Sequence, residues 1–242
     1  MALVVATFVG SLLYLPQFMQ KLLNYTPLEA GLGMLPEMAT FAVVSFLEGT
    51  LYDKFGARAM VASGAACLAL GPFLLSLVGP DSGYWVLVPG MIVIGIGLGL
   101  FLASVTTAGI SVVAPSRTSL AGGLLYMFQL VAASVGLGLT TAIVTLTSQN
   151  QLSALLANLG VNFTMGQIQT IHGILAGTAS AHKMLNNLGP NLAVQITQLV
   201  YSAFVAGIQN GFRVDALLSF TGFLVSLIYI HGKKNVKTSR RH

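Results

Sequence analysis

Six apolar stretches of the chain are each long enough to cross a lipid bilayer as a helix, and they limit the fold more than any other feature. They cover residues 2–19, 30–49, 59–78, 84–107, 120–145 and 212–230. A helix needs about 20 mostly apolar residues to span a hydrocarbon core of about 30 Å. The sequence therefore predicts a single all-α integral membrane domain over residues 1–242.

Composition agrees with a membrane protein and argues against several other classes. Only 7% of the residues are charged, whereas an average soluble domain has about 25%, so a soluble enzyme is not expected. Five of the eleven lysine and arginine residues lie in the last ten positions, behind an apolar stretch. The net charge of +5 therefore indicates membrane topology and does not predict a nucleic-acid partner.

The sequence also lacks the patterns of catalytic and metal sites. His172 and His182 lie ten residues apart with no cysteine or acidic residue near them, whereas zinc sites need three or four such ligands. No nucleotide-binding loop or Ser/His/Asp arrangement occurs. The single cysteine, Cys67, has no internal disulfide partner. The sequence therefore predicts neither an enzyme nor a bound metal or cofactor.

The distribution of lysine and arginine predicts the orientation in the membrane. If the first helix starts inside, eight basic residues fall on the cytoplasmic side and three on the outer side. Short loops rich in lysine and arginine remain cytoplasmic. The protein is thus expected in the plasma membrane. Both termini, including the basic tail 231–242, are expected on the cytoplasmic side.

Residues 146–210 are predicted to form a long extracytoplasmic loop. The stretch 191–208 is apolar enough for a seventh span, but a seventh span would place the basic tail outside. The loop is therefore interpreted as a series of short amphipathic helices. Four leucines at helical spacing are expected to face the membrane surface: Leu152, Leu155, Leu156 and Leu159.

A short charged loop joins the second and third apolar stretches. It reads Gly49-Thr50-Leu51-Tyr52-Asp53-Lys54-Phe55-Gly56-Ala57-Arg58. Asp53 can accept hydrogen bonds from nearby backbone or basic groups, and Gly56 suits a tight turn. Taken alone, the loop is a solvated turn with basic residues on the inner side. Its pattern resembles the loop G-x-L-x-D-[RK]-x-G-x-[RK] of the major facilitator superfamily, with Gly49, Asp53, Lys54, Gly56 and Arg58 at the matching positions.

Further elements resemble the fourteen-helix drug:proton antiporters of that superfamily. They are Tyr14-Leu15-Pro16 with Gln20, Pro27-Leu28-Glu29-Ala30-Gly31 followed by Leu35-Pro36, and the run Gly95, Gly97 and Gly99. One departure is Gln129, which lies where these antiporters usually carry a basic residue. The resemblance covers the carboxy-terminal six-helix half of the fold and implies six transmembrane helices arranged as two inverted three-helix repeats.

The resemblance also implies a function and partners. It implies proton-coupled multidrug efflux, in which small lipophilic and often cationic compounds leave the cell in exchange for protons. A complete transporter binds its substrate between two halves, so this chain is expected to form a homodimer or to pair with a missing amino-terminal half. It could be a truncated or split product, a pairing half or a remnant. The alternative function is a non-transporting membrane scaffold or assembly protein.

Two acidic residues fall within the second apolar stretch. Glu37 and Glu48 lie eleven residues apart, which places them on one helix face and roughly 16 Å apart in height. A charge in mid-membrane costs about 2.5 to 3.5 kcal/mol on insertion scales, so such residues face a cavity or a partner. Pro36 removes a backbone donor beside Glu37 and so loosens the helix there. Glu37 is therefore interpreted either as a carboxylate that binds a proton or cation, or as a neutral acid bonded to a neighbouring helix.

The remaining polar and glycine residues of the spans have structural interpretations. Glu48 is, with Glu37, a candidate residue for binding a proton or substrate, but a structural role is favoured for it, as a partner of Arg58, Lys54 or the backbone of the charged loop. Arg213 and Asp215 begin the last apolar stretch and are expected to form an interfacial pair or to reach the membrane surface. The run Gly95, Gly97 and Gly99 follows no strand, so it predicts close packing of helices and not a nucleotide-binding loop.

Overall fold

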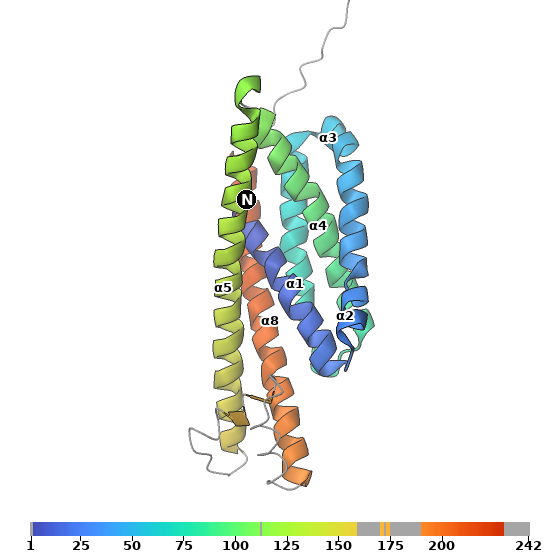
Figure 1. Ribbon diagram of the computed structural model, residues 1–242, viewed down its shortest axis with the longest axis vertical. Coiled ribbons are helices and arrows are strands. Elements are labelled where there is room, and N and C mark those ends of the chain that lie inside the picture. The colour runs from blue at the N-terminus through green and yellow to red at the C-terminus, as the bar shows by residue number, and fades with distance from the viewer. Residues whose placement is uncertain (1, 112, 159–169, 172, 175–189, 230–242) are drawn as a thin grey trace, which may run out of the picture.

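The computed structural model describes residues 2–111, 113–158, 170–171, 173–174 and 190–229, and the regular secondary structure of this part of the chain is entirely helical. The helices are α1 (Ala2–Leu22), α2 (Pro27–Gly33), α3 (Leu35–Leu75), α4 (Tyr84–Ser111), α5 (Thr118–Asn158) and α8 (Pro190–Tyr229), with a short 3-10 turn η1 at Pro115–Arg117. The long helices lie side by side in one bundle, with α1 crossing between α5 and α4 (Figure 1). The all-α prediction is thus confirmed.

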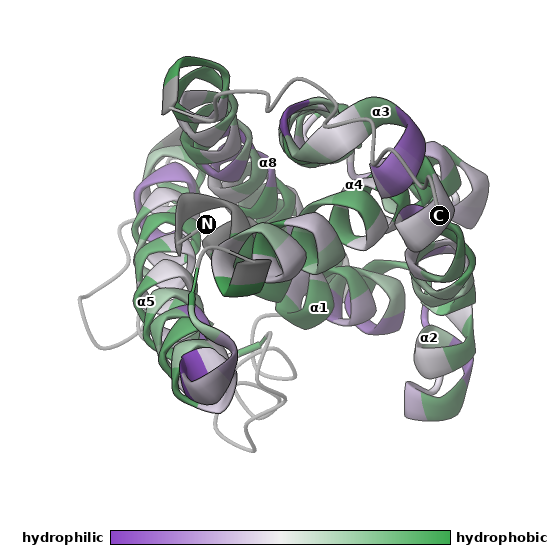
Figure 2. Ribbon diagram, turned by 90° about the horizontal axis from the view of Figure 1, so that it is seen from above, coloured by the Kyte–Doolittle hydropathy of each residue, from purple (hydrophilic) through white to green (hydrophobic). Residues whose placement is uncertain are grey.

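Four segments of the described chain are long and apolar enough to cross a membrane. They are Pro27–Leu75, Tyr84–Ile110, Pro115–Ala157 and Leu192–Ile228. Seen from above, apolar residues cover the outward sides of the helices as well as the sides that face one another (Figure 2). A soluble bundle would present polar residues on its outer side, so this surface suits contact with lipid.

Helix α3 consists of two antiparallel arms that meet at Gly56. This residue has φ +81° and ψ 164°, whereas the residues on either side are helical. Positive φ is open to glycine but costly for residues with a Cβ. The charged loop predicted between two separate helices is therefore shorter than expected, because helix continues through Phe55 and resumes at Ala57. One glycine makes the reversal (Figure 1).

The first arm of α3 is preceded by a short, separate helix. Thr26 caps α2 through a reciprocal capping box with Glu29, in which the Thr26 N–H donates to Glu29 Oε2 at 2.8 Å. The helix stops at Gly33, and α3 starts after Met34 with Pro36 in its first turn. The predicted single helix 30–49 thus begins earlier and is interrupted, because proline cannot donate the backbone bond that would continue it.

Glycines bring α4 into close contact with both arms of α3. A Cβ on Gly95 would lie 2.5 Å from the carbonyl oxygen of Glu37, and one on Gly99 would lie 2.7 Å from the Cβ of Val44. A Cβ on Gly97 would lie 2.9 Å from the backbone nitrogen of Leu68 in the second arm. The alternating glycines therefore face two different helices, and none of the three positions has room for a side chain.

The predicted long loop 146–210 is wrong in its secondary structure. Its first part continues α5 to Asn158, and its last part belongs to α8, which begins at Pro190 and contains the whole stretch 191–208. Each of these helices has about 40 residues and so extends for about 60 Å, twice the thickness of a hydrocarbon core. The predicted last span, 212–230, is only the second half of α8.

The leucines of that stretch pack against protein and not against the membrane surface. Leu152 and Leu156 of α5 form a small buried cluster with Ile196, Val200 and Ala203 of α8 and with Ile171. Leu155 packs against the same cluster, and Leu159 lies outside the described residues. The leucines do lie on one helix face as expected, but a second helix covers that face.

Candidate functional site

Glu37 lies fully buried at the break between α2 and α3. Its side chain has no exposed surface, and Oε1 lies 3.1 Å from the Ser11 hydroxyl of α1. Oε2 is buried without any hydrogen-bond partner. A buried carboxyl oxygen without a partner is costly in either protonation state, which makes Oε2 a candidate position for a proton, a water molecule or a cation.

The backbone around Glu37 differs from that of a regular helix. The Glu37 N–H donates to the carbonyl oxygen of Met34 at 3.1 Å, a bond from three residues back, because Pro36 and Met34 interrupt the usual pattern. Interrupted helices in membrane bundles place backbone groups and ionisable side chains together at binding sites. The interruption predicted beside Glu37 is therefore present, one to three residues before the carboxylate.

Glu48, near the end of the same arm, has a different partner from the one expected. Its carboxylate accepts a hydrogen bond from the Ser104 hydroxyl of α4, and its side chain is only 5% exposed. Arg58 donates instead to the carbonyl oxygen of Leu227 in α8 at 2.9 Å. The prediction that Glu48 pairs with Arg58 or the loop is therefore wrong, because the helix orients the carboxylate toward α4. Glu37 and Glu48 thus contact different helices.

Asp215 is a buried carboxylate that the sequence analysis misplaced. It has no exposed surface, and Oδ1 accepts a hydrogen bond from the Thr140 hydroxyl of α5 at 2.7 Å. Arg213 is exposed and donates to Asn210 at 3.1 Å, so the expected Arg213–Asp215 pair does not form. Since α8 begins at Pro190 and not near residue 212, Asp215 lies in the middle of a long helix and not in its first turn.

Helix α1 fits closely against Asp215. Oδ2 of this residue is buried without a hydrogen-bond partner, and a Cβ on Gly10 of α1 would lie only 2.5 Å from it. No local sequence pattern predicts this contact, because Gly10 and Asp215 are separated by some two hundred residues.

The charged loop is exposed and holds few contacts. The Asp53 carboxylate has no hydrogen bond or ion pair within the described residues. The Lys54 Nζ lies 5.3 Å from the ring centroid of the adjacent Phe55. Gly49 is exposed and has open space around it. Arg58 alone links the loop to a distant element, through the carbonyl of Leu227. The structure therefore brings Arg58 to α8 but does not bring Asp53 to a partner.

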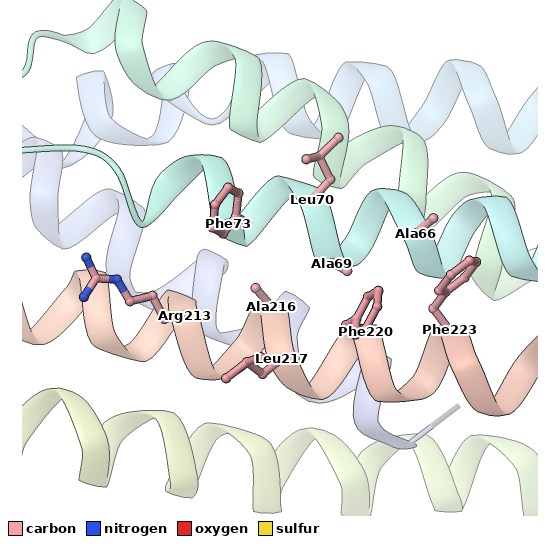
Figure 3. Close-up of a pocket in the computed structure, with 9 residues that line it drawn as sticks. All are labelled: Ala66, Ala69, Leu70, Phe73, Arg213, Ala216, Leu217, Phe220 and Phe223. Atoms are coloured by element: carbon pink, nitrogen blue, oxygen red, sulfur yellow. The ribbon is translucent and has the colours of Figure 1, made fainter.

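An apolar groove with a volume of about 560 Å³ lies between the second arm of α3 and α8. Arg213 lies at one end of the groove and Phe223 at the other (Figure 3). The remaining lining residues are Ala66, Ala69, Leu70, Phe73, Ala216, Leu217 and Phe220. None of the buried carboxylates lines this groove, so it is separate from the site around Glu37.

Metal ligands do not gather within the part of the chain that the structure describes. There, no three histidine, cysteine or acidic residues lie close enough to hold a metal ion. His172 and His182 lie outside the described residues.

Comparison with known proteins identifies the family. The profile of the Major Facilitator Superfamily matches residues 1–137, which is more than half of the chain. The chain belongs to this superfamily. It is therefore a multi-pass membrane protein of a transporter family and not an enzyme.

The similar curated proteins include drug exporters from bacteria. Multidrug resistance protein Stp of Mycobacterium tuberculosis is 35% identical over 127 residues, which cover 52% of this chain and 24% of Stp. Drug efflux pump JefA of the same organism is 26% identical over 230 residues, covering 92% of this chain and 44% of JefA. Methylenomycin A resistance protein of Bacillus subtilis is 28% identical over 184 residues, covering 72% and 39%. The chain spans less than half the length of these relatives.

Proposed function

We propose that the chain is the carboxy-terminal six-helix half of a proton-coupled multidrug exporter, in which Glu37 binds the coupling proton. The observation that carries this proposal is the fully buried Glu37 carboxylate at a helix interruption, with one oxygen lacking a partner. The similarity of the chain to two drug-resistance proteins and one drug efflux pump supports a role of this carboxylate in transport. Intramembrane carboxylates of this kind serve as ion or proton sites in transporters.

The hydroxyl of Ser11 can form two different hydrogen-bond arrangements, depending on whether Glu37 is ionised or protonated. Ser11 Oγ lies 2.8 Å from the carbonyl oxygen of Phe8 and 3.1 Å from Glu37 Oε1. A serine has only one O–H group, so it cannot donate to both acceptors at once. When Glu37 is ionised, the hydroxyl donates to the carboxylate. When Glu37 is protonated, its own O–H donates to Ser11, which then donates to Phe8.

This exchange links the protonation of Glu37 to α1. Ionised Glu37 draws the Ser11 hydroxyl away from the Phe8 carbonyl, whereas neutral Glu37 returns it to the helix. The carboxylate lies beside the α2–α3 interruption, which is the weakest point of that segment. A change of protonation therefore acts on two neighbouring segments, and this is the coupling that alternating access requires.

The proposed six spans are α1, the two arms of α3, α4, α5 and α8. In the inverted-repeat arrangement, α1 with α3 forms one three-helix repeat and α4, α5 and α8 form the other. The orientation follows the positive-inside rule, with Lys54, Arg117 and both termini in the cytoplasm. The ends of α5 and α8 at Asn158 and Pro190 then project on the outer side, beyond the thickness of the bilayer.

A second half is expected because one wall of the fold lacks cover. Helix α5 exposes a row of large apolar side chains along its length: Leu120, Leu124, Met127, Phe128, Val131, Val135 and Leu139. This spacing of three to four residues forms one continuous helix face. A second copy of the chain, or a separate amino-terminal half, would pack against it and enclose a binding site for small lipophilic, often cationic compounds.

The experiment that tests the function is transport by the chain in lipid vesicles. Purified protein is reconstituted, a proton gradient is imposed, and movement of a fluorescent lipophilic cation is followed with and without an uncoupler. Gradient-dependent movement of the dye supports the proposal. If the chain forms stable assemblies but moves no dye, with or without a co-expressed amino-terminal half from a relative, the scaffold alternative is the better account.

A further inference from the structure

A second buried carboxylate lies on the opposite flank of α1 from Glu37. Ser11 contacts Glu37, and the preceding residue, Gly10, lies against Asp215. Consecutive residues of a helix point about 100° apart. Gly10 and Ser11 therefore face two different carboxylates on two different sides of α1. Each of them has one oxygen bonded to a hydroxyl and the other oxygen buried without a partner.

Among the described residues, no cation lies where it could neutralise Asp215. On α1, the titratable residues are Tyr14, close enough to Asp215 for an electrostatic interaction, and Lys21, which lies over the ring of Phe204. Helix α5 carries no charged residue and contributes the Thr140 hydroxyl. The second arm of α3 carries Cys67 and Arg58, and Arg58 is bonded to the Leu227 carbonyl.

On α8 itself, the nearest basic residue also points elsewhere. Arg213 is exposed, donates a hydrogen bond to Asn210, and lines the apolar groove between the second arm of α3 and α8. An ionised carboxylate held by a single neutral hydroxyl in such surroundings is strongly disfavoured. A proton is the smallest ligand that removes the charge, and α1 packs so closely here that a Cβ on Gly10 would lie 2.5 Å from Oδ2.

We propose that Asp215 is a second proton-binding carboxylate of the bundle and that α1 couples it to Glu37 through Gly10 and Ser11. This inference extends the function proposed for Glu37 but concerns a different residue and helix. The proton is exchanged with water, and only the carboxyl O–H bond forms or breaks. A shift of α1 away from Asp215 opens Oδ2, and the same shift changes the distance between Ser11 and Glu37.

Coupling through a shared helix has a quantitative consequence. If protonation of one carboxyl changes the proton affinity of the other, the effect must be equal in both directions. Removal of Asp215 should therefore change the proton affinity of Glu37 by the same factor as removal of Glu37 changes that of Asp215. We expect a factor of about five or more, which is the lower end of typical coupling between sites.

Infrared spectroscopy of the full chain in lipid nanodiscs tests this directly, because protonated carboxyl groups have a separate carbonyl band. The pH is varied for the wild type, Glu37→Gln, Asp215→Asn and the double variant. We expect two titrating bands in the wild type, one in each single variant and none from these groups in the double variant. Glu48→Gln is the control and should leave both bands in place.

Two results would overturn the inference. One is an unchanged set of titrating bands in Asp215→Asn, and the other is a Glu37 midpoint that does not respond to that substitution. Should Asp215→Asn fail to fold, Thr140→Val decides the matter, since it removes only the donor to Oδ1 and must shift the Asp215 band. A Thr140→Val spectrum identical to the wild type would also overturn it. If both bands titrate in the wild type but Glu37→Gln leaves transport unchanged, only the proposed function is rejected.

Discussion

Gly64 of α3 and Gly97 of α4 face each other so closely that a Cβ on either residue would lie 3.0 Å from the carbonyl oxygen of the other. Two helical turns away, Gly71 and Gly90 repeat the arrangement, with corresponding distances of 3.2 and 3.3 Å. The two helices therefore cross with their backbones almost in contact. In a bilayer, where apolar burial gives little drive for association, such close backbone packing is a main source of stability.

Gly97→Ala is expected to destabilise the bundle by about 1 to 3 kcal/mol, the usual range for overpacking. Its Cβ would also lie 2.6 Å from Leu68 Cγ, so both backbone and side chain must move. Unfolding by a denaturing detergent, followed by circular dichroism, measures the change. Gly138→Ala is the matched control, because this helical glycine of α5 has open space around it. Equal stability of the two variants would contradict the packing argument.

Much of the fold could be predicted from such local features. Apolar length identified the helices, Gly56 marked the reversal and Pro36 marked the interruption beside Glu37. The extent of α5 and α8 could not be predicted, because Gln195 and Gln198 give the start of α8 the appearance of a polar loop. In the structure these two residues are exposed while Ile196 and Val200 are buried against α5. Because one side of the start of α8 packs against the end of α5, its sequence is apolar on that side and polar on the other, as in a helix that lies on the membrane surface.

The candidate site was only partly readable for a related reason. Glu37 and Glu48 are recognisable because a carboxylate within an apolar run is rare. Asp215 gave the same signal, but the apparent start of its helix at residue 212 placed it at the membrane surface beside Arg213. Its burial depends on Thr140 and Gly10, which are contacts between distant segments that no local pattern specifies.

Glu37→Gln is expected to reduce proton-driven drug transport by about tenfold or more while drug binding persists. Glutamine keeps the size and hydrogen-bonding capacity of the side chain but cannot gain or lose the proton. Initial rates of dye movement in vesicles, measured from mildly acidic to mildly alkaline pH, provide the test. Glu48→Gln is the control and should have the smaller effect, because Glu48 already has Ser104 as a partner. If proton-driven dye movement by Glu37→Gln is unchanged across that pH range, the role of Glu37 is structural.

Gly56→Val is expected to impair folding of the α3 reversal by about 1 to 3 kcal/mol, because a β-branched residue is strained at φ +81°. Gly49→Val is the control, since Gly49 lies within the regular helix of the same arm with open space around it. Stability in detergent and the amount of inserted protein are the measurements. A stable Gly56→Val protein would mean that the turn adopts another conformation.

Asp53→Asn is expected to abolish transport while insertion remains normal. Its carboxylate is exposed and has no bonded partner in the described part of the chain, so its loss removes no contact of the folded bundle. A functional contact would then form only during the transport cycle. Membrane amounts and dye transport are measured together, with Lys54→Gln as a control of the opposite charge. Unchanged transport would reduce the loop to a topology signal.

Labelling of introduced cysteines tests the orientation of the chain. Cys67 is the single native cysteine, so Cys67→Ser provides a background for Lys237→Cys and Asp81→Cys. A membrane-impermeant thiol reagent added to intact cells should label position 81 and not position 237, because the basic tail is expected in the cytoplasm. Permeabilised cells should label both. External labelling at position 237 would contradict the proposed orientation and, with it, the assignment of the six spans.

The exposed face of α5 leads to a prediction about assembly. Without a second half, the chain is expected to form a dimer, because a row of large apolar side chains on α5 lacks cover. Light scattering in detergent, corrected for bound detergent, should give at least twice the chain mass of 25.3 kDa. Val131→Trp on α5 should weaken the dimer, whereas Ile228→Trp on α8, at a similarly exposed position (61% and 68%), should be accommodated by lipid. A monomer that transports the dye would show that one half is sufficient and that the row on α5 faces lipid.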